Sequence, residues 1–232
     1  MHTATVAGVA FVLAFCSIVY ELLLGQTLAA FLGNTVLRLS VTVGLYLLSM
    51  GIGAFLARGR VLARPVLALQ SVELALSVTG AAAVPLLFLL DSWGAPHAAL
   101  SATGHGLIVL IGVLTGLELP LLLELGGGAV DVRRNFVLGV DYVGALIGTL
   151  VFAFWFYPRA GLVTTAFVVA SLNAFAGVLL ASQIGRSPAE DRSRHGLVLV
   201  AQLLVLCATV VCLARADAIA EACIRLYLGG DA

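Results

Sequence analysis

The chain has 232 residues, of which 62% are hydrophobic and only 10% are charged, and its formal net charge is zero. A composition this apolar excludes an ordinary soluble domain, and the lack of net positive charge gives no indication of a nucleic-acid partner. Repeated apolar runs, each long enough to cross about 30 Å of hydrocarbon, predict an all-α fold, a polytopic transmembrane helical bundle. The lipid bilayer is the first partner that the sequence implies.

Seven apolar runs follow one another, and each is interpreted as one transmembrane helix. They cover residues 6–32, 37–57, 66–90, 97–123, 135–157, 162–184 and 197–213. The first run is too long for the core of a signal peptide and has no basic start, so it is kept as a span. Residues 1–213 therefore form a seven-span transmembrane domain, and residues 214–232 form a short tail, expected to be an amphipathic helix or a linker.

The connections between the runs carry turn and charge signals. Gly33-Asn34-Thr35 and the segment from Asp91 to His97 are rich in turn-forming residues. The connections after the second, fourth and sixth runs, which share one side, hold eight arginines, against four on the other side. Because arginine is enriched in cytoplasmic loops, we expect a multi-pass protein of a bacterial inner membrane with a cytoplasmic N-terminus.

Four carboxyl side chains interrupt the apolar runs, namely Glu21, Glu73, Glu118 and Asp141. An ionised carboxylate in hydrocarbon costs about 3 kcal/mol or more, so these side chains are expected to face the bundle interior. Counted from the arginine-rich side, the last three lie roughly 8–12 Å deep and form one layer. We expect these three to line one cavity that opens toward that side.

Other features of the runs favour close helix packing beside these acids. Gly144 and Gly148 lie three and seven residues after Asp141, on the same helical face. Small residues at this spacing are typical of helix contacts in membranes. Pro120, two residues after Glu118, leaves the carbonyl of Gly116 without its helical donor. Such a broken turn is found where transporters coordinate cations, but it is equally typical of a structural kink.

The candidate ligand-binding residues combine these acids with aromatic and amide side chains that share their helices. They are Glu21, Glu73, Glu118, Asp141, Tyr20, Tyr142, Gln70 and Asn173. Carboxylates and aromatic faces are the groups that bind organic cations. The alternative is that the acids form ion pairs with flanking arginines. No catalytic residue, metal site or cofactor is predicted, and the four cysteines are interpreted as small core residues.

Several motifs together resemble the membrane domain of the membrane-bound spermidine synthase-like proteins, the polyamine aminopropyltransferase family. They are Val19-Tyr20-Glu21, Gly33-Asn34-Thr35, Met50-Gly51-Ile52-Gly53, Val72-Glu73-Leu74, Gly116-Leu117-Glu118-Leu119-Pro120, the stretch from Asp141 to Gly148, and Leu172-Asn173-Ala174. The resemblance implies a seven-span domain that is usually fused to a soluble enzyme. That enzyme moves an aminopropyl group from decarboxylated S-adenosylmethionine to putrescine. The soluble transferase domain is missing from this sequence, so none of its catalytic residues can be assigned.

Three functions are compatible with these features. The first is binding or transport of polyamines or related organic cations through the intramembrane carboxylates. The second is a structural membrane anchor or assembly domain for an aminopropyltransferase domain or subunit. The third is a membrane enzyme in its own right, which no visible nucleophile–base pair or metal-ligand spacing favours. The sequence alone does not decide between a natural separate subunit and a truncated chain.

Overall fold

A computed structural model describes residues 3–125, 131–181 and 192–227 of the chain. In these ranges the chain forms helices joined by short turns, and no strand occurs. The helices are α1 (Thr3–Leu32), α2 (Thr35–Leu56), α3 (Arg60–Ala63), α4 (Pro65–Ser92), α5 (His97–Leu125), α6 (Asp131–Val151), η1 (Phe152–Ala160), α7 (Gly161–Ala181), α8 (Arg192–Ala214) and α9 (Ala216–Tyr227). The predicted all-helical architecture is confirmed.

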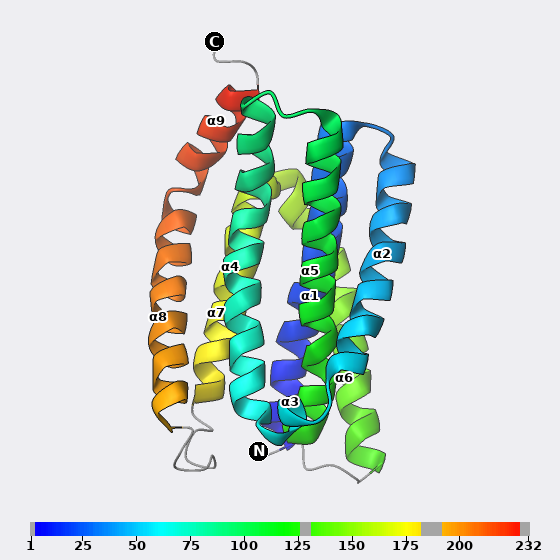
Figure 1. Cartoon of the computed structure of the whole chain (residues 1–232), viewed down its shortest axis with the longest axis vertical. Coiled ribbons are helices and arrows are strands. Elements are labelled where there is room, and N and C mark those ends of the chain that lie inside the picture. Colours follow the sequence, from blue (N-terminus) through cyan, green and yellow to red (C-terminus); the bar gives the residue numbers. More distant parts are fainter. Residues whose placement is uncertain (1–2, 126–130, 182–191, 228–232) are drawn as a thin grey trace.

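The long helices stand side by side in an upright bundle, with the two chain ends at opposite ends of it (Figure 1). Helix α1 is the central element, because it packs against α2, α5, α6 and α7. Its side chains Leu13, Val19, Leu23 and Leu28 are completely or almost completely buried. The hydrophobic core therefore surrounds the first apolar run of the sequence.

Two glycine turns reverse the chain where the sequence predicts turns. Gly33 and Asn34 have φ angles of 69° and 50°, and the Asn34 side chain accepts a hydrogen bond of 3.2 Å from the Leu37 amide. That bond caps the start of α2, because it satisfies one of the free amides of the first turn. Gly94, with φ 71°, lies in the turn between α4 and α5. The left-handed conformation at these sites favours glycine and asparagine.

Glycines allow two pairs of helices to approach closely. A Cβ atom on Gly144 or Gly148 would lie 2.5 Å from the Phe11 carbonyl oxygen or 2.8 Å from that of Phe15, both on α1. Gly53 of α2 likewise meets the backbone of α5 at Val113. The prediction that the glycines of the fifth run lie at a helix contact is confirmed. In the second run it holds for Gly53, whereas Gly44 and Gly51 face open space.

The segment from α6 to α7 differs from the predicted pair of separate spans. Helical turns continue through the nine-residue π-helix η1, even though it contains Pro158. The chain then reverses direction at the end of η1, where Gly161 has φ 75° (Figure 1). By length and composition, six segments of the described residues could cross a membrane, with residues 134–180 counted as one. The predicted number of seven is therefore not reproduced by this count.

Three smaller expectations concern the second half of the chain. His195, which the sequence pattern assigns to a polar loop, is a buried residue of α8, because that helix begins at Arg192. The predicted helix of the tail is α9, and its residues Ile219 and Cys223 join the core. Cys207 is exposed, so the expectation that all four cysteines are core residues is wrong for this one. The glycine run at residues 126–128 lies outside the described residues.

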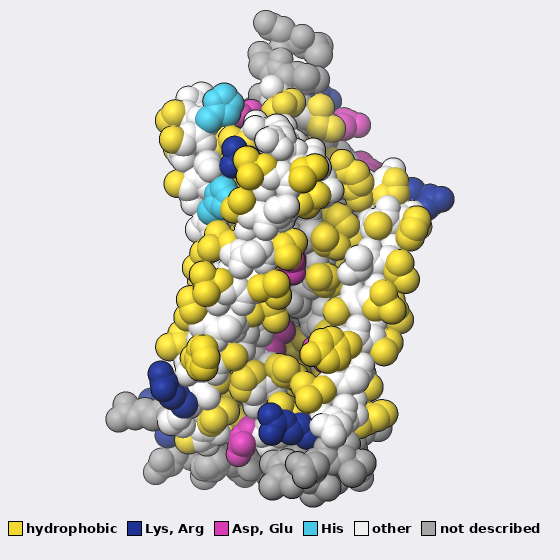
Figure 2. All heavy atoms as spheres, turned by 90° about the vertical axis from the view of Figure 1, so that its right-hand side faces the viewer, with side chains coloured by type: hydrophobic (Ala, Val, Ile, Leu, Met, Phe, Trp, Pro, Cys, Tyr) yellow, Lys and Arg dark blue, Asp and Glu magenta, His cyan; other side chains and the backbone are white. Residues whose placement is uncertain are grey.

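The outer surface of the bundle is apolar. Large hydrophobic side chains are exposed along α2, α6, η1 and α8, including Leu48, Phe55, Leu146, Phe154 and Leu204. Figure 2 shows hydrophobic atoms covering most of the face formed by α2 and its neighbours, with basic side chains gathered near the ends of the bundle. Soluble proteins rarely expose a contiguous apolar surface of this extent.

Candidate functional site

The candidate site is a cluster of polar side chains in the centre of the bundle, and Tyr46 of α2 connects its parts. The Tyr46 hydroxyl lies 3.0 Å from the Ser17 hydroxyl and 3.1 Å from the Ser17 carbonyl oxygen, both on α1. It also donates to the Thr115 hydroxyl of α5 at 3.1 Å. Tyr46 is fully buried. A single phenol therefore links three helices that come from distant parts of the sequence.

Two carboxyl groups lie beside this hydroxyl network. Glu73 of α4 is fully buried and Glu118 of α5 is nearly so. Their carboxyl groups are close enough to interact directly. No well-formed hydrogen bond from the described residues reaches either Glu73 oxygen. Two ionised carboxylates at this depth would repel each other strongly, because the surroundings screen charge poorly.

The other two predicted acids approach the same cluster from different helices. Glu21 of α1 is buried. Its carboxyl group and that of Glu118 both lie close enough to the Tyr46 hydroxyl for an electrostatic interaction. Asp141 of α6 is half-buried, and its charge acts on Glu118. Glu73, Glu118 and Asp141, the three acids expected at one depth, thus lie near one another, and Glu21 lies near the Tyr46 hydroxyl. Whether they bind a ligand is a separate question, which stays a prediction.

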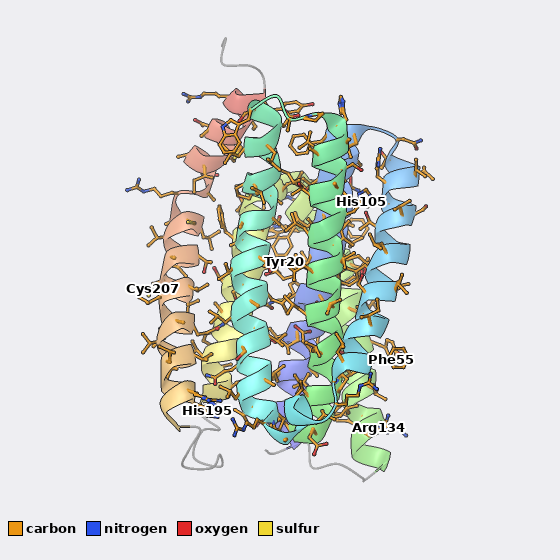
Figure 3. The ribbon with its side chains drawn as sticks, in the orientation of Figure 1. Tyr20, Phe55, His105, Arg134, His195 and Cys207 are labelled. Atoms are coloured by element: carbon orange, nitrogen blue, oxygen red, sulfur yellow. The ribbon has the colours of Figure 1, made fainter. Side chains whose placement is uncertain are left out.

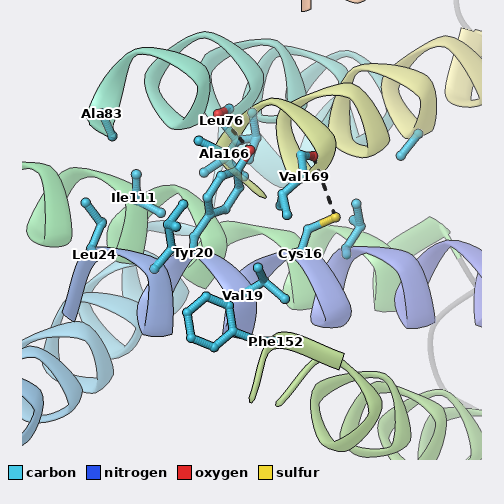
Figure 4. Packing of buried hydrophobic residues seen from close by; sticks show 14 of the residues in the cluster. Cys16, Val19, Tyr20, Leu24, Leu76, Ala83, Ile111, Phe152, Ala166 and Val169 are labelled. Atoms are coloured by element: carbon cyan, nitrogen blue, oxygen red, sulfur yellow. Dashed lines mark hydrogen bonds between the residues drawn. The ribbon is translucent and has the colours of Figure 1, made fainter. Parts of the chain in front are cut away.

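Tyr20 closes the cluster on the side of α4. Its hydroxyl donates to the Leu76 carbonyl oxygen at 3.4 Å, and its ring fills the space that Gly80 leaves free. Figure 4 shows this contact beside a weak bond from the Cys16 thiol to the Val169 carbonyl oxygen, 3.9 Å long. Both bonds tie α1 to helices that flank it. Tyr20 therefore has a clear packing role in addition to its predicted site role.

The two predicted amides lie apart from the acid cluster, in contacts with α8. Gln70 of α4 is fully buried, and its Oε1 atom lies 2.9 Å from Nδ1 of His195. Asn173 of α7 is buried, and its carbonyl oxygen and that of Ala174 accept bonds from the Gln202 side chain at 3.5 Å and 3.1 Å. The Gln70 side chain thus links α4 to α8, and the backbone of α7 at Asn173 and Ala174 is linked to α8 by Gln202. The side-chain amide of Asn173 itself is buried and has no hydrogen-bond partner among the described residues. Sequence reasoning missed the roles of His195 and Gln202.

Tyr142 is a predicted site residue whose side chain lies on the outside of the bundle. Its side chain is 74% exposed on the outer face of α6. Consecutive residues of a helix point about 100° apart. Since Asp141 faces the interior, its neighbour points away from it.

A groove opens at the arginine-rich end of the bundle, below the acid cluster. Its volume is about 610 Å³. It lies between α2 and α6 and is floored by α5, with Met50, Thr115, Leu119 and Leu138 among its lining residues. Figure 2 shows a hollow between two columns of hydrophobic atoms, with acidic side chains visible in it at mid-height, above the end of the bundle where the groove opens. Glu21, Glu73, Glu118 and Asp141 are not among the residues that line this groove, so the predicted acid-lined cavity is not observed there.

The sequence is similar to polyamine aminopropyltransferases over most of its length. It is 32% identical over 239 aligned residues to polyamine aminopropyltransferase 2 of Streptomyces coelicolor, which covers 97% of this chain and 42% of that protein. It is 35% identical over 176 aligned residues to the polyamine aminopropyltransferase of Leptospira interrogans. That alignment covers 75% of this chain and 34% of the Leptospira protein. No family model and no solved structure matches the chain.

These relatives support the family resemblance and correct the functional prediction. Proteins that match up to 97% of the chain are named as enzymes. The expectation that the chain binds or transports polyamines through intramembrane carboxylates is therefore wrong, and so is its alternative, a structural anchor or assembly domain. The relation to polyamines themselves is supported by the relatives' names. The chain spans between 34% and 42% of the length of these two relatives.

Proposed function

We propose that the chain is the membrane-spanning part of a polyamine aminopropyltransferase and that aminopropyl transfer is the activity it serves. The similarity to polyamine aminopropyltransferase 2 of Streptomyces coelicolor along 97% of the chain carries this proposal. In the proposed reaction, a polyamine amine attacks the aminopropyl carbon of a sulfonium donor. A carbon–nitrogen bond forms, the carbon–sulfur bond breaks, and the amine releases a proton.

The membrane placement has its own support. Six segments of the described chain are long and apolar enough to cross a bilayer. Large hydrophobic side chains cover the outside of the bundle, whereas Glu73 and Glu118 are buried inside it. Because α6 and α7 run in opposite directions on either side of η1, we propose seven crossings in place of six. The arginine distribution supports the further proposal that the N-terminus lies in the cytoplasm of a bacterium.

The remainder of the relatives' length points to a partner. This chain covers 42% of the Streptomyces coelicolor protein and 34% of the Leptospira interrogans protein. The proposal allows a soluble aminopropyltransferase domain or subunit as a partner, with this helical bundle itself taking part in the reaction and not serving only as an anchor. The polar cluster around Tyr46 is the candidate region through which the bundle influences the reaction, because it contains the bundle's buried carboxyl groups.

Aminopropyl transfer in membranes tests this function directly. The whole gene product would be produced in a bacterial host that lacks its own aminopropyltransferases, and membranes would be supplied with decarboxylated S-adenosylmethionine and putrescine. We expect spermidine to form in the membrane fraction. A version with the bundle intact but the soluble partner removed is expected to give no product. Spermidine uptake into vesicles without any aminopropyl transfer would contradict the proposal.

A further inference from the structure

The groove at the arginine-rich end has a lining that suits one class of ligand. Its walls are mainly apolar, with Met50, Leu119, Leu123 and Leu138 among them. Its volume of about 610 Å³ is in the range of sites that bind small organic molecules. Helices α2 and α6 both pack against α1 but not closely against each other, which leaves the groove open along the side of the bundle.

Two opposite charges lie at this groove. Glu124 of α5 and Arg134 of α6 both line it, and both side chains are exposed. No ion pair joins them in the described part of the chain, where the exposed pair Glu221 and Arg225 of α9 does form one. Figure 3 shows Arg134 at the lower end of the bundle, at the same end as Phe55 of α2. The lining of this mainly apolar groove thus includes one carboxylate and one guanidinium.

We propose that this groove binds a phospholipid with an ethanolamine headgroup. The inference depends on the membrane placement in the proposed function but goes beyond the enzyme's reaction. The guanidinium of Arg134 would bind the phosphate through two parallel hydrogen bonds, a geometry that a planar guanidinium favours. The carboxylate of Glu124 would accept hydrogen bonds from the primary ammonium. The acyl chains would lie along the leucines and Met50.

The pair of charges selects this headgroup among the common phospholipids. A purely anionic lipid would satisfy Arg134 but would place a second negative charge near Glu124. A choline headgroup has a cation without any N–H donor, so Glu124 could attract it but could not form a hydrogen bond with it. The ethanolamine headgroup offers one phosphate and one ammonium, and it therefore complements both side chains.

Lipid retention by the purified protein tests this inference. The full protein would be placed in nanodiscs with equal parts of ethanolamine, choline and glycerol phospholipids, then exchanged into mild detergent, and its bound lipids counted by native mass spectrometry. We expect the ethanolamine lipid to be retained about tenfold over the choline lipid, the ratio that one charge-assisted hydrogen bond of about 1.4 kcal/mol provides. Equal retention of the three lipids, or a preference for the glycerol lipid, would overturn the proposal.

Matched variants separate the two charges. Arg134→Gln should reduce retention of ethanolamine and choline lipids alike, whereas Glu124→Gln should remove only the preference between them. Glu221→Gln and Arg225→Gln change the exposed pair on α9 and should leave retention unchanged. Loss of selectivity in these controls would show that the groove is not the site. Spermidine formation that persists without lipid selectivity would overturn this inference alone, and recovery of the protein outside the membrane fraction would overturn the membrane placement as well.

Discussion

Tyr46 has a larger structural role than any other single hydroxyl in the described bundle, because it contacts groups on two other helices. Replacing it with phenylalanine removes bonds to Ser17 and Thr115 and leaves their buried oxygens without this partner. We expect Tyr46→Phe to lower the free energy of unfolding by about 1–3 kcal/mol. Denaturant unfolding of the purified protein in detergent would measure the loss.

Tyr142 provides the matched control for that substitution. It is the same residue type, but its side chain is 74% exposed and no hydrogen bond of its hydroxyl is observed among the described residues. Tyr142→Phe should therefore change stability by less than about 0.5 kcal/mol. Equal losses in the two variants would refute the central role of Tyr46.

A substitution at Glu73 is expected to raise the stability of the fold. Both of its carboxyl oxygens are buried without a well-formed hydrogen bond, and Glu118 lies beside it. An unsatisfied buried polar group costs about 1–3 kcal/mol, so an apolar side chain of similar size should stabilise the fold by about that amount. Glu73→Met should raise the melting temperature, whereas Glu73→Gln, which keeps a polar group there, should not. A lower melting temperature for Glu73→Met would show that the carboxyl group is well satisfied.

At the scale of single residues, the sequence predicts how deep in the bundle a residue lies better than it predicts which way the side chain points. The convergence of Glu73, Glu118 and Asp141 follows from their distances to the helix ends, and the structure brings them together. Tyr142 is a candidate ligand-binding residue by residue type alone, and its side chain is exposed on α6, in a direction that helix geometry separates from that of Asp141. The hydrogen bonds of Tyr46 with Ser17 and Thr115 could not be predicted from the sequence, since hydroxyl side chains are common in apolar helices and their pairing depends on the tertiary packing.

At the scale of elements, the contact between α1 and α6 depends on glycine. A methyl group on Gly144 would meet the Phe11 carbonyl oxygen at 2.5 Å, and backbone cannot move aside as easily as a side chain. We expect Gly144→Ala to lower the free energy of unfolding by about 1–3 kcal/mol through overpacking. Thermal unfolding in detergent would measure this change.

Gly139, five residues earlier on α6, serves as the control for that substitution. A methyl group there meets nothing within 4 Å, and the site is exposed. Gly139→Ala should therefore stabilise the helix by up to about 1 kcal/mol, because alanine loses less backbone entropy than glycine. Similar effects of the two alanines would indicate that α6 does not pack closely on α1 in solution.

The elements themselves were largely predictable, and the exceptions have physical reasons. Long apolar runs locate α1, α2, α4 and α5, and the turn at Gly33 and Asn34 is visible in the residue types. The start of α8 at Arg192 could not be placed, because its first residues are polar and resemble a loop. Helix η1 could not be predicted either, since proline normally argues for a break and only the packing keeps the turns continuous.

At the scale of the whole molecule, the proposed orientation can be tested by chemical labelling. In a variant without native cysteines, a cysteine would replace either Arg58, near the arginine-rich end, or Arg215, at the opposite end; both positions are exposed. With the N-terminus in the cytoplasm, a membrane-impermeant maleimide added to intact cells should label Arg215→Cys and not Arg58→Cys. The reverse pattern would invert the orientation, and labelling of both in sealed cells would argue against a membrane-spanning bundle.

Whole-molecule function was the least predictable property. The buried acids suggested a cation site, but the same acids occur in a chain whose relatives are named as transferases. Carboxyl groups inside an apolar bundle show that polar groups are buried within it. They do not show which reaction the protein serves. That information came from similarity along the chain, which physical reasoning about single residues cannot supply.

The π-helix η1 also keeps a row of buried residues on the side of the segment that faces α1. Gly144, Gly148, Phe152 and Phe156 are spaced four apart and are all buried, and Phe156 contacts the ring of Phe15 with centroids 6.2 Å apart. A spacing of four drifts around an α-helix of 3.6 residues per turn, whereas the wider turns of a π-helix cancel part of that drift. Deleting Ala153, an exposed residue of η1, should therefore return this stretch to α-helical winding and rotate Phe156 away from Phe15. The wider turns of η1 thus keep these residues on the side that faces α1, from the end of α6 to the reversal at Gly161.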